Sequence, residues 1–395
     1  MNNPLTDPDV SWKDAGSDFI RSEVSGGAVL LAAAIAAVLW ANAPFGDSYS
    51  AFWQTNLTVG FGGFEISDDL QHWVNDALMT LFFFVVGLEI KRELVVGELN
   101  DRAKATLPLI AAAGGVTLPA IIFLALNATG AGIDGWAIPM ATDIAFAVAV
   151  LALLGSRVPP GVRLLILSIA IVDDIIAITV IAFFYTSGIS LAWLALGFGG
   201  LLLVVLMRRL DIVRILPYVL VGFVVWLGFF ESGVHATIAG VLLGLLTPAR
   251  PVNGHHILGT IEYRLHPWTS MLIVPLFALA NAGIVLSAAV MADAVASSVF
   301  WGILSGLILG KTFGISLATF AAQRFGLGEV PEGVESADVW GIAALGGIGF
   351  TVSLFISQLA YAVPETVEIA KLGIFAGSLI SAVLGSVLLL RRTKA

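Results

Sequence analysis

The sequence predicts an all-α integral membrane protein with about twelve transmembrane helices, and three observations support this fold class. First, 58% of the 395 residues are hydrophobic and only 12% are charged, whereas soluble domains are about 45–50% apolar and about 25% charged. Second, long apolar runs follow one another along most of the chain. Third, the positive residues gather in alternate connections between these runs. The composition excludes a disordered chain, a collagen and a nucleic-acid-binding module.

The apolar runs define the expected helices. A hydrocarbon core of about 30 Å requires about 20 apolar residues per helix. Runs near this length cover 24–41, 73–90, 105–126, 135–154, 163–185, 191–207, 212–230, 233–247, 265–284, 300–322, 339–361 and 368–390. Because the connections are mostly short, residues 1–395 are expected to form one transmembrane domain.

The positive residues predict the orientation of the helices. With the N-terminus inside, 17 of the 19 Lys and Arg residues lie on the inner side. They are Lys13, Arg21, Lys91, Arg92, Arg102, Lys104, Arg157, Arg163, Arg208, Arg209, Arg214, Arg250, Arg264, Arg324, Arg391, Arg392 and Lys394. This asymmetry places both termini in the cytoplasm. The net charge of -9 owes much to acids on the outer side, so it does not indicate a binding preference.

One outer connection has the pattern of a β-hairpin. Residues 57–66 alternate apolar and small residues about a glycine turn, which is typical of a hairpin. We therefore expect an outside hairpin within approximately 45–66. A disordered loop is the alternative on sequence grounds.

Four ionisable residues lie deep inside apolar runs: Asp143, Asp173, Asp174 and Lys311. Asp173 follows the interfacial Arg163 by ten residues, or about 15 Å of helix, which places it at the midplane. A charge there costs at least about 2.5–3.5 kcal/mol. A buried ion pair that only fixes helix packing is the structural alternative, and Asp143 is the expected partner of Lys311.

The adjacent acids point to ion exchange. Neighbouring helical residues point about 100° apart, so one lysine cannot easily satisfy both Asp173 and Asp174. At least one carboxylate must take a proton or bind a cation. The chain has no cysteine, which excludes disulfides, iron–sulfur clusters and thiolate zinc sites. Of the five histidines, His255 and His256 lie in a loop-like stretch beside Asn253 and Gly254, so any bound ion is expected to be held by oxygen.

Two spans carry backbone interruptions. Pro139 lies four residues before Asp143, and Gly346-Gly347-Ile348-Gly349 interrupts the run 339–361. Each interrupted span is the second of three helices, in the segments 105–185 and 300–390. These segments must run in opposite senses across the membrane, so they are expected to be inverted repeat halves. Paired broken helices in inverted halves indicate the binding site of a transporter.

The sequence closely resembles the NhaA-type sodium/proton antiporters. The matching stretches cover nearly the whole chain in order: Asn75-Asp-Ala-Leu-Met79, Val86-Gly-Leu-Glu-Ile-Lys-Arg-Glu-Leu94, Trp136-Ala-Ile-Pro-Met-Ala-Thr-Asp-Ile-Ala-Phe146, Leu151-Ala-Leu-Leu-Gly-Ser-Arg-Val158, Ser232-Gly-Val-His-Ala-Thr237, Leu265-His-Pro-Trp268, Pro275-Leu-Phe-Ala-Leu-Ala-Asn-Ala-Gly283, Gly310-Lys311 and Gly346-Gly-Ile-Gly-Phe-Thr351. This family is itself a known example of inverted repeats with broken helices.

The resemblance implies secondary transport by alternating access, which expels sodium or lithium in exchange for external protons and serves sodium and pH homeostasis. It assigns sodium binding to Asp173 and Asp174, and places Thr142, Asp143 and Lys311 in the surrounding assembly. It implies no enzymatic activity and no cofactor beyond the transported ions. It also implies a homodimer helped by the outside hairpin, contact with membrane lipid, and a location in the bacterial inner membrane.

The resemblance further implies regulation by pH at the cytoplasmic mouth, through Glu89, Glu93 and Glu262. One departure concerns Gly259 and Thr260, where the family can have basic residues. Ordinary solvated charges at helix ends are the alternative for the three glutamates.

Three other functions are alternatives to sodium/proton exchange. A retinal protein could use a buried lysine for a Schiff base, but twelve spans with paired broken helices argue against it. A passive cation channel could use carboxylates as a filter, and it predicts conductance without proton counter-movement. A hydrolytic enzyme is disfavoured because no Ser/His/Asp or metal-ligand set converges on the sequence.

Overall fold

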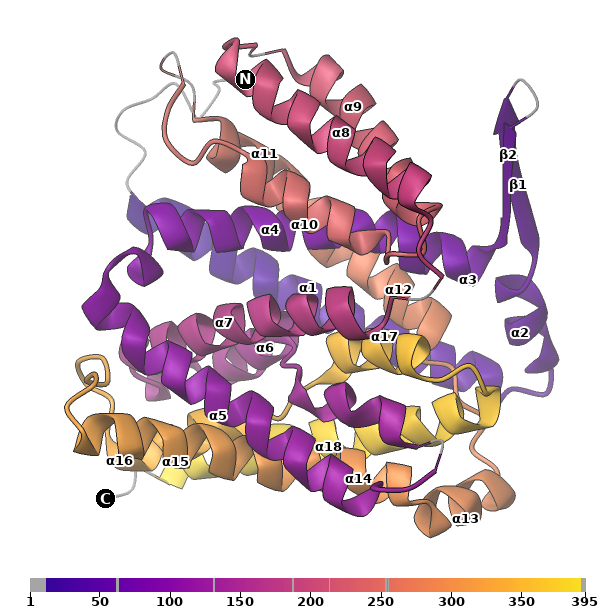
Figure 1. Ribbon diagram of the computed structural model, residues 1–395. Helices are drawn as coiled ribbons and strands as arrows, with labels where there is room; N and C mark the ends of the chain where they lie inside the picture. The colour runs from indigo at the N-terminus through magenta and orange to yellow at the C-terminus, as the bar shows by residue number, and fades with distance from the viewer. Residues whose placement is uncertain are drawn as a thin grey trace.

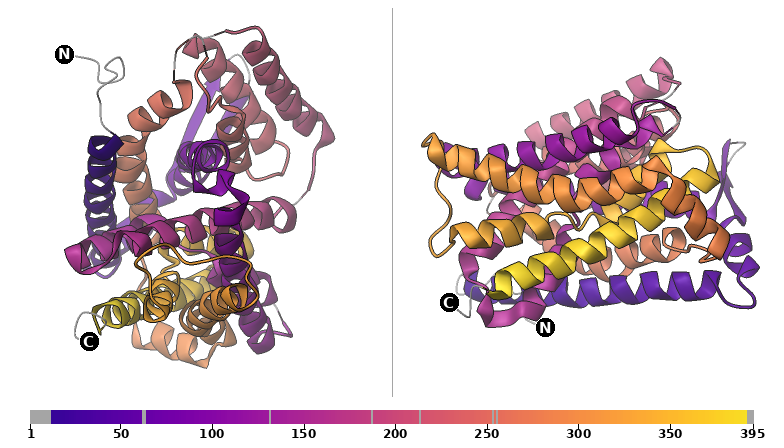
Figure 2. Two further views of the ribbon diagram at one scale, coloured as in Figure 1. Left: turned by 90° about the vertical axis from the view of Figure 1, so that its left-hand side faces the viewer. Right: turned by 90° about the horizontal axis from the view of Figure 1, so that it is seen from below.

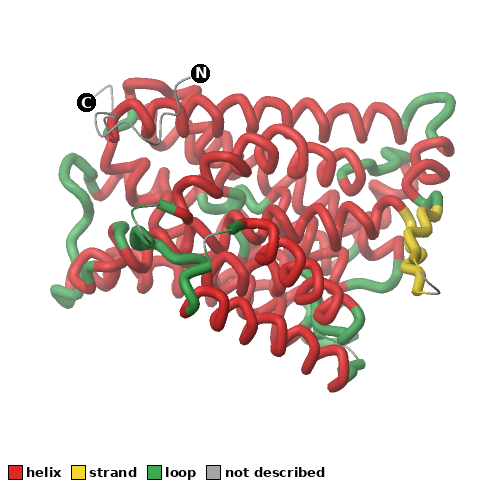
Figure 3. Tube along the Cα trace, turned by 90° about the horizontal axis from the view of Figure 1, so that it is seen from above, coloured by secondary structure: helices red, strands yellow, loops and turns green. Residues whose placement is uncertain are grey.

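The computed structural model describes residues 12–61, 64–130, 132–186, 188–212, 214–252, 254 and 256–391. Residues 62 and 63 of the expected hairpin, and both chain ends that were expected in the cytoplasm, lie outside this part. The described chain is an assembly of packed helices with one small pair of strands at one end (Figure 3). The predicted all-α membrane fold is confirmed.

The helices follow one another with short connections (Figure 1). The α-helices are α1 (Trp12–Ala41), α2 (Asp47–Trp53), α3 (Leu70–Trp73), α4 (Met79–Val95), α5 (Arg102–Leu126), α6 (Ile144–Leu154), α7 (Pro160–Phe184), α8 (Leu191–Arg209), α9 (Ile215–Phe230), α10 (Thr237–Leu246), α11 (Ile257–Trp268), α12 (Val274–Asn281), α13 (Ala288–Ala296), α14 (Ser298–Ser305), α15 (Lys311–Arg324), α16 (Ser336–Leu345), α17 (Phe350–Ala360) and α18 (Pro364–Arg391). Single π-helical turns at Val74–Leu78, Thr269–Ile273 and Gly306–Gly310 join α3 to α4, α11 to α12 and α14 to α15.

Within the described ranges, seven helical segments are long and apolar enough to cross a membrane. They are Leu70–Val95, Arg102–Leu126, Ile133–Leu154, Pro160–Phe184, Leu191–Arg209, Ser298–Arg324 and Pro364–Arg391. The pair α16 and α17 forms one more span, which is bent by 46° at its break. Ser25–Ala41, Ile215–Phe230 and Thr237–Leu246 are shorter apolar helices. The count of twelve therefore stays a prediction.

The strands form an antiparallel ribbon that projects from one end of the helices (Figure 1). Strand β1 (Asn56–Phe61) pairs with β2 (Phe64–Asp69), with Asn56 opposite Asp69. The segment expected to hold the hairpin, 45–66, also contains α2, and the ribbon continues to residue 69. At its base, the Asp69 side chain accepts a hydrogen bond from the His72 amide and caps α3.

Glycines bring two helix pairs into backbone contact, and these pairs position the site. A Cβ on Gly314 of α15 would lie 2.3 Å from the Gly114 carbonyl oxygen of α5, and the converse distance is the same. On α10, a Cβ on Gly240 would lie 2.2 Å from the Thr80 carbonyl oxygen of α4. Only glycine permits such approaches. In the view from below, the orange α15 and the purple α5 lie side by side (Figure 2).

Candidate functional site

Both expected interruptions are present, and they meet. Residues 141–143 lie without helical structure between the 3-10 helix Ile133–Met140 and α6, and residues 346–349 separate α16 from α17. Pro139 is the penultimate residue of that 3-10 helix. The Asp143 amide donates to the Ile348 carbonyl oxygen over 2.6 Å. The two broken spans are therefore joined directly through their backbones.

The Asp143 carboxylate binds both broken spans. Its Oδ1 accepts from the Phe146 amide at 2.9 Å, which caps the start of α6. Its Oδ2 accepts from the Thr351 amide at 3.0 Å and the Thr351 hydroxyl at 2.5 Å. Thr351 lies in the first turn of α17. A carboxylate at two helix N-termini compensates their unpaired amides and positive dipole ends.

Lys311 pairs with Asp173, so the expected pairing with Asp143 is wrong. The Lys311 Nζ atom contacts Asp173 Oδ2, and the two residues are 0% and 1% exposed. The physical reason is that Asp143 is already held by amide donors of both broken spans. In addition, Gly314, where α15 meets α5, lies three residues after Lys311, and α5 also packs on α7, which carries Asp173.

Thr142 links this ion pair to the second break. Its hydroxyl lies 2.6 Å from Asp173 Oδ2 and 2.8 Å from the Gly346 carbonyl oxygen. Since a hydroxyl has one proton, it can donate to only one of these acceptors at a time. Thr142 is itself buried, with 2% of its surface exposed.

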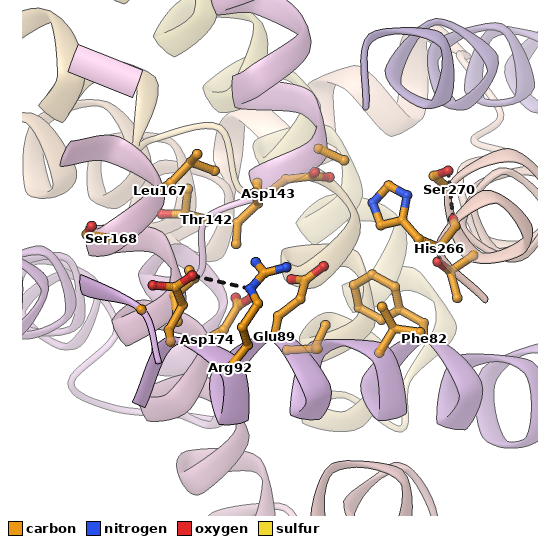
Figure 4. Close-up of a pocket in the computed structure, with 18 of the residues that line it drawn as sticks. Phe82, Glu89, Arg92, Thr142, Asp143, Leu167, Ser168, Asp174, His266 and Ser270 are labelled. Atoms are coloured by element: carbon orange, nitrogen blue, oxygen red, sulfur yellow. Dashed lines mark hydrogen bonds and ion pairs between the residues drawn. The ribbon is translucent and has the colours of Figure 1, made fainter. Parts of the chain in front are cut away.

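Asp174 lies on a different face of α7 from Asp173. It lines a cavity of about 530 Å³, which also reaches Glu89, Thr142 and Asp143 (Figure 4). Asp174 is 8% exposed. The cavity wall also includes Leu167 and Ile171, which share this face of α7, but it does not include Asp173. The turn of about 100° between adjacent helical residues produces this separation.

A cluster of charged residues also borders the cavity (Figure 4). Arg92 of α4 pairs with Glu262 of α11, and its Nε lies 3.5 Å from Glu93 Oε1. Glu89, Arg92 and Glu93 line the cavity, whereas Glu262 contacts Arg92 but is not itself a lining residue. Burial raises the pKa of the Glu262 carboxyl above its ordinary value, although Arg92 opposes this shift. Glu262 precedes the span expected at 265–284.

Several residues of this region were not assigned from the sequence. Thr351 and Arg92 both fall inside the matching stretches. Arg92 is a positive charge beside two glutamates, and Thr351 is a hydroxyl residue after the glycine cluster, so each position could have been noticed in the sequence. Ser168 and His266 also line the cavity. Whether these two side chains face the cavity depends on how each helix is rotated about its own axis, and residue spacing alone does not predict that rotation.

The comparisons with known proteins identify the family. Residues 17–389 match the family model described as Na+/H+ antiporter 1. The chain belongs to this family. The resemblance to NhaA-type antiporters is thus confirmed.

Curated relatives of the family match along nearly their whole length. The chain is 44% identical over 379 residues to the Na(+)/H(+) antiporter NhaA 2 of Erythrobacter litoralis, covering 96% of this chain and 94% of the relative. It is 46% identical over 378 residues to the Na(+)/H(+) antiporter NhaA of Cronobacter sakazakii, covering 94% and 96%. The protein is therefore a multi-pass membrane protein of an antiporter family.

Proposed function

We propose that this protein is a secondary transporter that exchanges intracellular sodium or lithium for external protons by alternating access. The observation that carries the proposal is the buried Asp174 carboxylate in a charged cavity, beside Asp173, which is paired with Lys311. Family membership and the names of the relatives support the same ions. The exchange serves sodium and pH homeostasis and requires no resident cofactor and no enzymatic step.

Asp174 and Asp173 are the proposed sodium ligands. Hard cations prefer oxygen ligands, and these two carboxylates come from one turn of α7. A sodium ion compensates a buried negative charge as a proton would, so the two cations compete for one site. When this site faces each side of the membrane in turn, the competition becomes antiport. Thr142, Asp143 and Lys311 are proposed to hold the surrounding helices in place.

The cavity is proposed to face the cytoplasm. Its outer wall includes Lys104, Asp101 and Glu98, at the connection between α4 and α5. Positive residues predict that this connection lies inside. The same rule places both termini inside a bacterial inner membrane, with the ribbon of β1 and β2 outside. The same proposal has three further parts. The segments 105–185 and 300–390 are inverted repeat halves, the protein forms a homodimer, and it contacts membrane lipid.

The decisive measurement uses purified protein in proteoliposomes with a preset pH gradient. Pulses of sodium or lithium should collapse the gradient, and potassium should not. A cation channel would instead pass current without proton counter-movement. Full exchange activity in Asp174→Asn would contradict the proposed site while leaving the exchange function standing. Absence of sodium-dependent collapse in the wild type would contradict the function itself.

A further inference from the structure

A serine hydroxyl of α17 reaches across to the first broken span. Ser353 Oγ donates a hydrogen bond to the Ile138 carbonyl oxygen at 2.7 Å, and both residues are 0% exposed. This contact lies before the break at 141–143, whereas Thr351 binds Asp143 after it. Ser353 itself does not line the cavity.

The Ile138 carbonyl group requires a donor from outside its own helix. It belongs to the last turn of the 3-10 helix Ile133–Met140, and the last carbonyl groups of a helix have no intrahelical partner. At Ala141 the chain becomes extended, with φ -79° and ψ 151°, so no further helical turn supplies a donor. A buried carbonyl group without a donor is costly. Ser353 therefore satisfies a backbone group that the break itself leaves open.

A glycine gives the Ser353 hydroxyl the space for this contact. A Cβ on Gly349 would lie 2.2 Å from Ser353 Oγ and 3.1 Å from the Ala141 carbonyl oxygen. Any other residue at this position would displace the hydroxyl or separate the two broken spans. Gly349 belongs to the cluster that interrupts the second span, so this glycine also permits the crossing of the two spans.

Two contacts hold the first broken span against the first turn of α17. Ser353 follows Thr351 by two residues, so their side chains point about 200° apart around the helix. Ser353 binds Ile138. Thr351 binds Asp143. The stretch of chain between these two contacts is therefore fixed at both of its ends by a single helical turn.

We infer that Ser353 is a positioning residue for ion binding, which acts by fixing the stretch that carries Thr142. The inference rests on the proposed function. The Thr142 hydroxyl lies 2.6 Å from Asp173 Oδ2, and Thr142 lines the cavity. A site that is ordered before its ligand arrives binds more tightly than one that must be ordered on binding. Ser353 therefore contributes to sodium affinity without touching the ion.

The test replaces Ser353 by alanine and measures the hydrogen–deuterium exchange of the purified protein by mass spectrometry. The informative peptide covers 136–147, because the amides of Asp143 and Phe146 are hydrogen-bonded at the break, and local opening controls such exchange. Ser353→Ala leaves the Ile138 carbonyl group without its donor. We therefore expect deuterium exchange in this peptide to be at least about fivefold faster, with the other peptides unchanged.

Sodium binding is the second measurement. With radioactive sodium at a fixed pH, half-saturation of Ser353→Ala should require about two- to tenfold more sodium than half-saturation of the wild type. Ser357→Ala is the matched control. Ser357 is also a serine of α17 with 0% exposure, but its hydroxyl donates to the Leu354 carbonyl oxygen of its own helix at 2.7 Å. This control should keep wild-type deuterium exchange in the peptide 136–147 and wild-type sodium affinity.

Any of three results would overturn the inference: wild-type deuterium exchange of 136–147 in Ser353→Ala, an equal acceleration in Ser357→Ala, or unchanged sodium affinity despite faster local exchange. If Ser353→Ala does not fold, Ser353→Cys, in which a weak donor replaces the hydroxyl, is measured against the same expectations. The wild type separates these results from failure of the proposed function. Absence of sodium binding by the wild type would contradict that function, whereas deuterium exchange of the variants still decides whether Ser353 fixes the broken span.

Discussion

Among the charged residues of the described chain that the proposed mechanism uses, Lys311 and Asp173 form the most deeply buried ion pair. Both residues are at most 1% exposed, so neither charge can be compensated by bulk water. Removing one partner of such a pair costs about 3–5 kcal/mol, because the other charge is stranded. The pair therefore has a structural role that can be measured independently of transport.

We predict that Lys311→Ala lowers the free energy of unfolding by about 3–5 kcal/mol as well as impairing exchange. The melting temperature in detergent measures the first effect. Lys104→Ala is the control, since Lys104 forms an exposed pair with Glu98 at 2.9 Å and should leave melting unchanged. Lost exchange with unaltered melting of Lys311→Ala would favour a proton-carrying role over a structural one, and wild-type behaviour in both assays would reject both.

The pKa of Glu262 gives a prediction for regulation. Burial raises this pKa, so the carboxylate becomes negative at a higher pH than an ordinary glutamate. A raised acid pKa also means that folding favours the protonated form, and this contribution to stability is lost as pH rises from the ordinary glutamate pKa through the raised one. Over that window, negative charge accumulates beside Arg92 and Glu93 at the cavity entrance.

We therefore expect Glu262→Gln to shift the pH dependence of exchange while largely preserving the rate at the new optimum. The measurement is exchange rate against pH in proteoliposomes. Glu329→Gln is the control, because Glu329 is an exposed glutamate in the connection between α15 and α16, which is expected on the same side of the membrane. Identical pH profiles for wild type, Glu262→Gln and Glu89→Gln would leave these residues as ordinary interfacial charges.

At the scale of elements, the sequence predicted positions along helices better than rotations about them. The apolar runs placed Asp173 at the midplane and Lys311 deep inside another span, and the structure brings the two side chains together. The chosen partner, Asp143, was wrong because residue spacing does not show that its oxygens already accept from Phe146 and Thr351. The breaks at 141–143 and 346–349 were predictable, since proline and clustered glycine have local effects on the backbone.

The crossing of α5 and α15 should tolerate no added side chain. A Cβ on Gly314 would lie 2.3 Å from a carbonyl oxygen of Gly114, and backbone cannot give way as a flexible side chain can. We predict that Gly314→Ala destabilises the protein by about 1–3 kcal/mol and reduces exchange by displacing Lys311. Thermal unfolding and exchange of Gly199→Ala are the comparison, because a Cβ there meets nothing within 4 Å. Equal melting of the two variants would contradict this packing argument.

At the scale of the whole molecule, the distribution of positive residues makes a prediction about orientation. The chain has no cysteine, so a single introduced thiol can be labelled without background. In intact cells, an impermeant thiol reagent should label Glu65→Cys on β2 and should not label Glu332→Cys in the connection between α15 and α16. Labelling after permeabilisation controls for reactivity. The reverse pattern would invert the proposed topology.

The Thr142 hydroxyl couples the charge of Asp173 to the vibration of a backbone carbonyl group. Its single proton is within reach of both Asp173 Oδ2 and the Gly346 carbonyl oxygen. A charged carboxylate is the stronger acceptor, so loss of charge at Asp173 should release the proton toward Gly346. The vibrational frequency of that carbonyl would then fall whenever Asp173 is neutralised, which would make the charge of a buried acid readable by infrared difference spectroscopy from a neighbouring helix break.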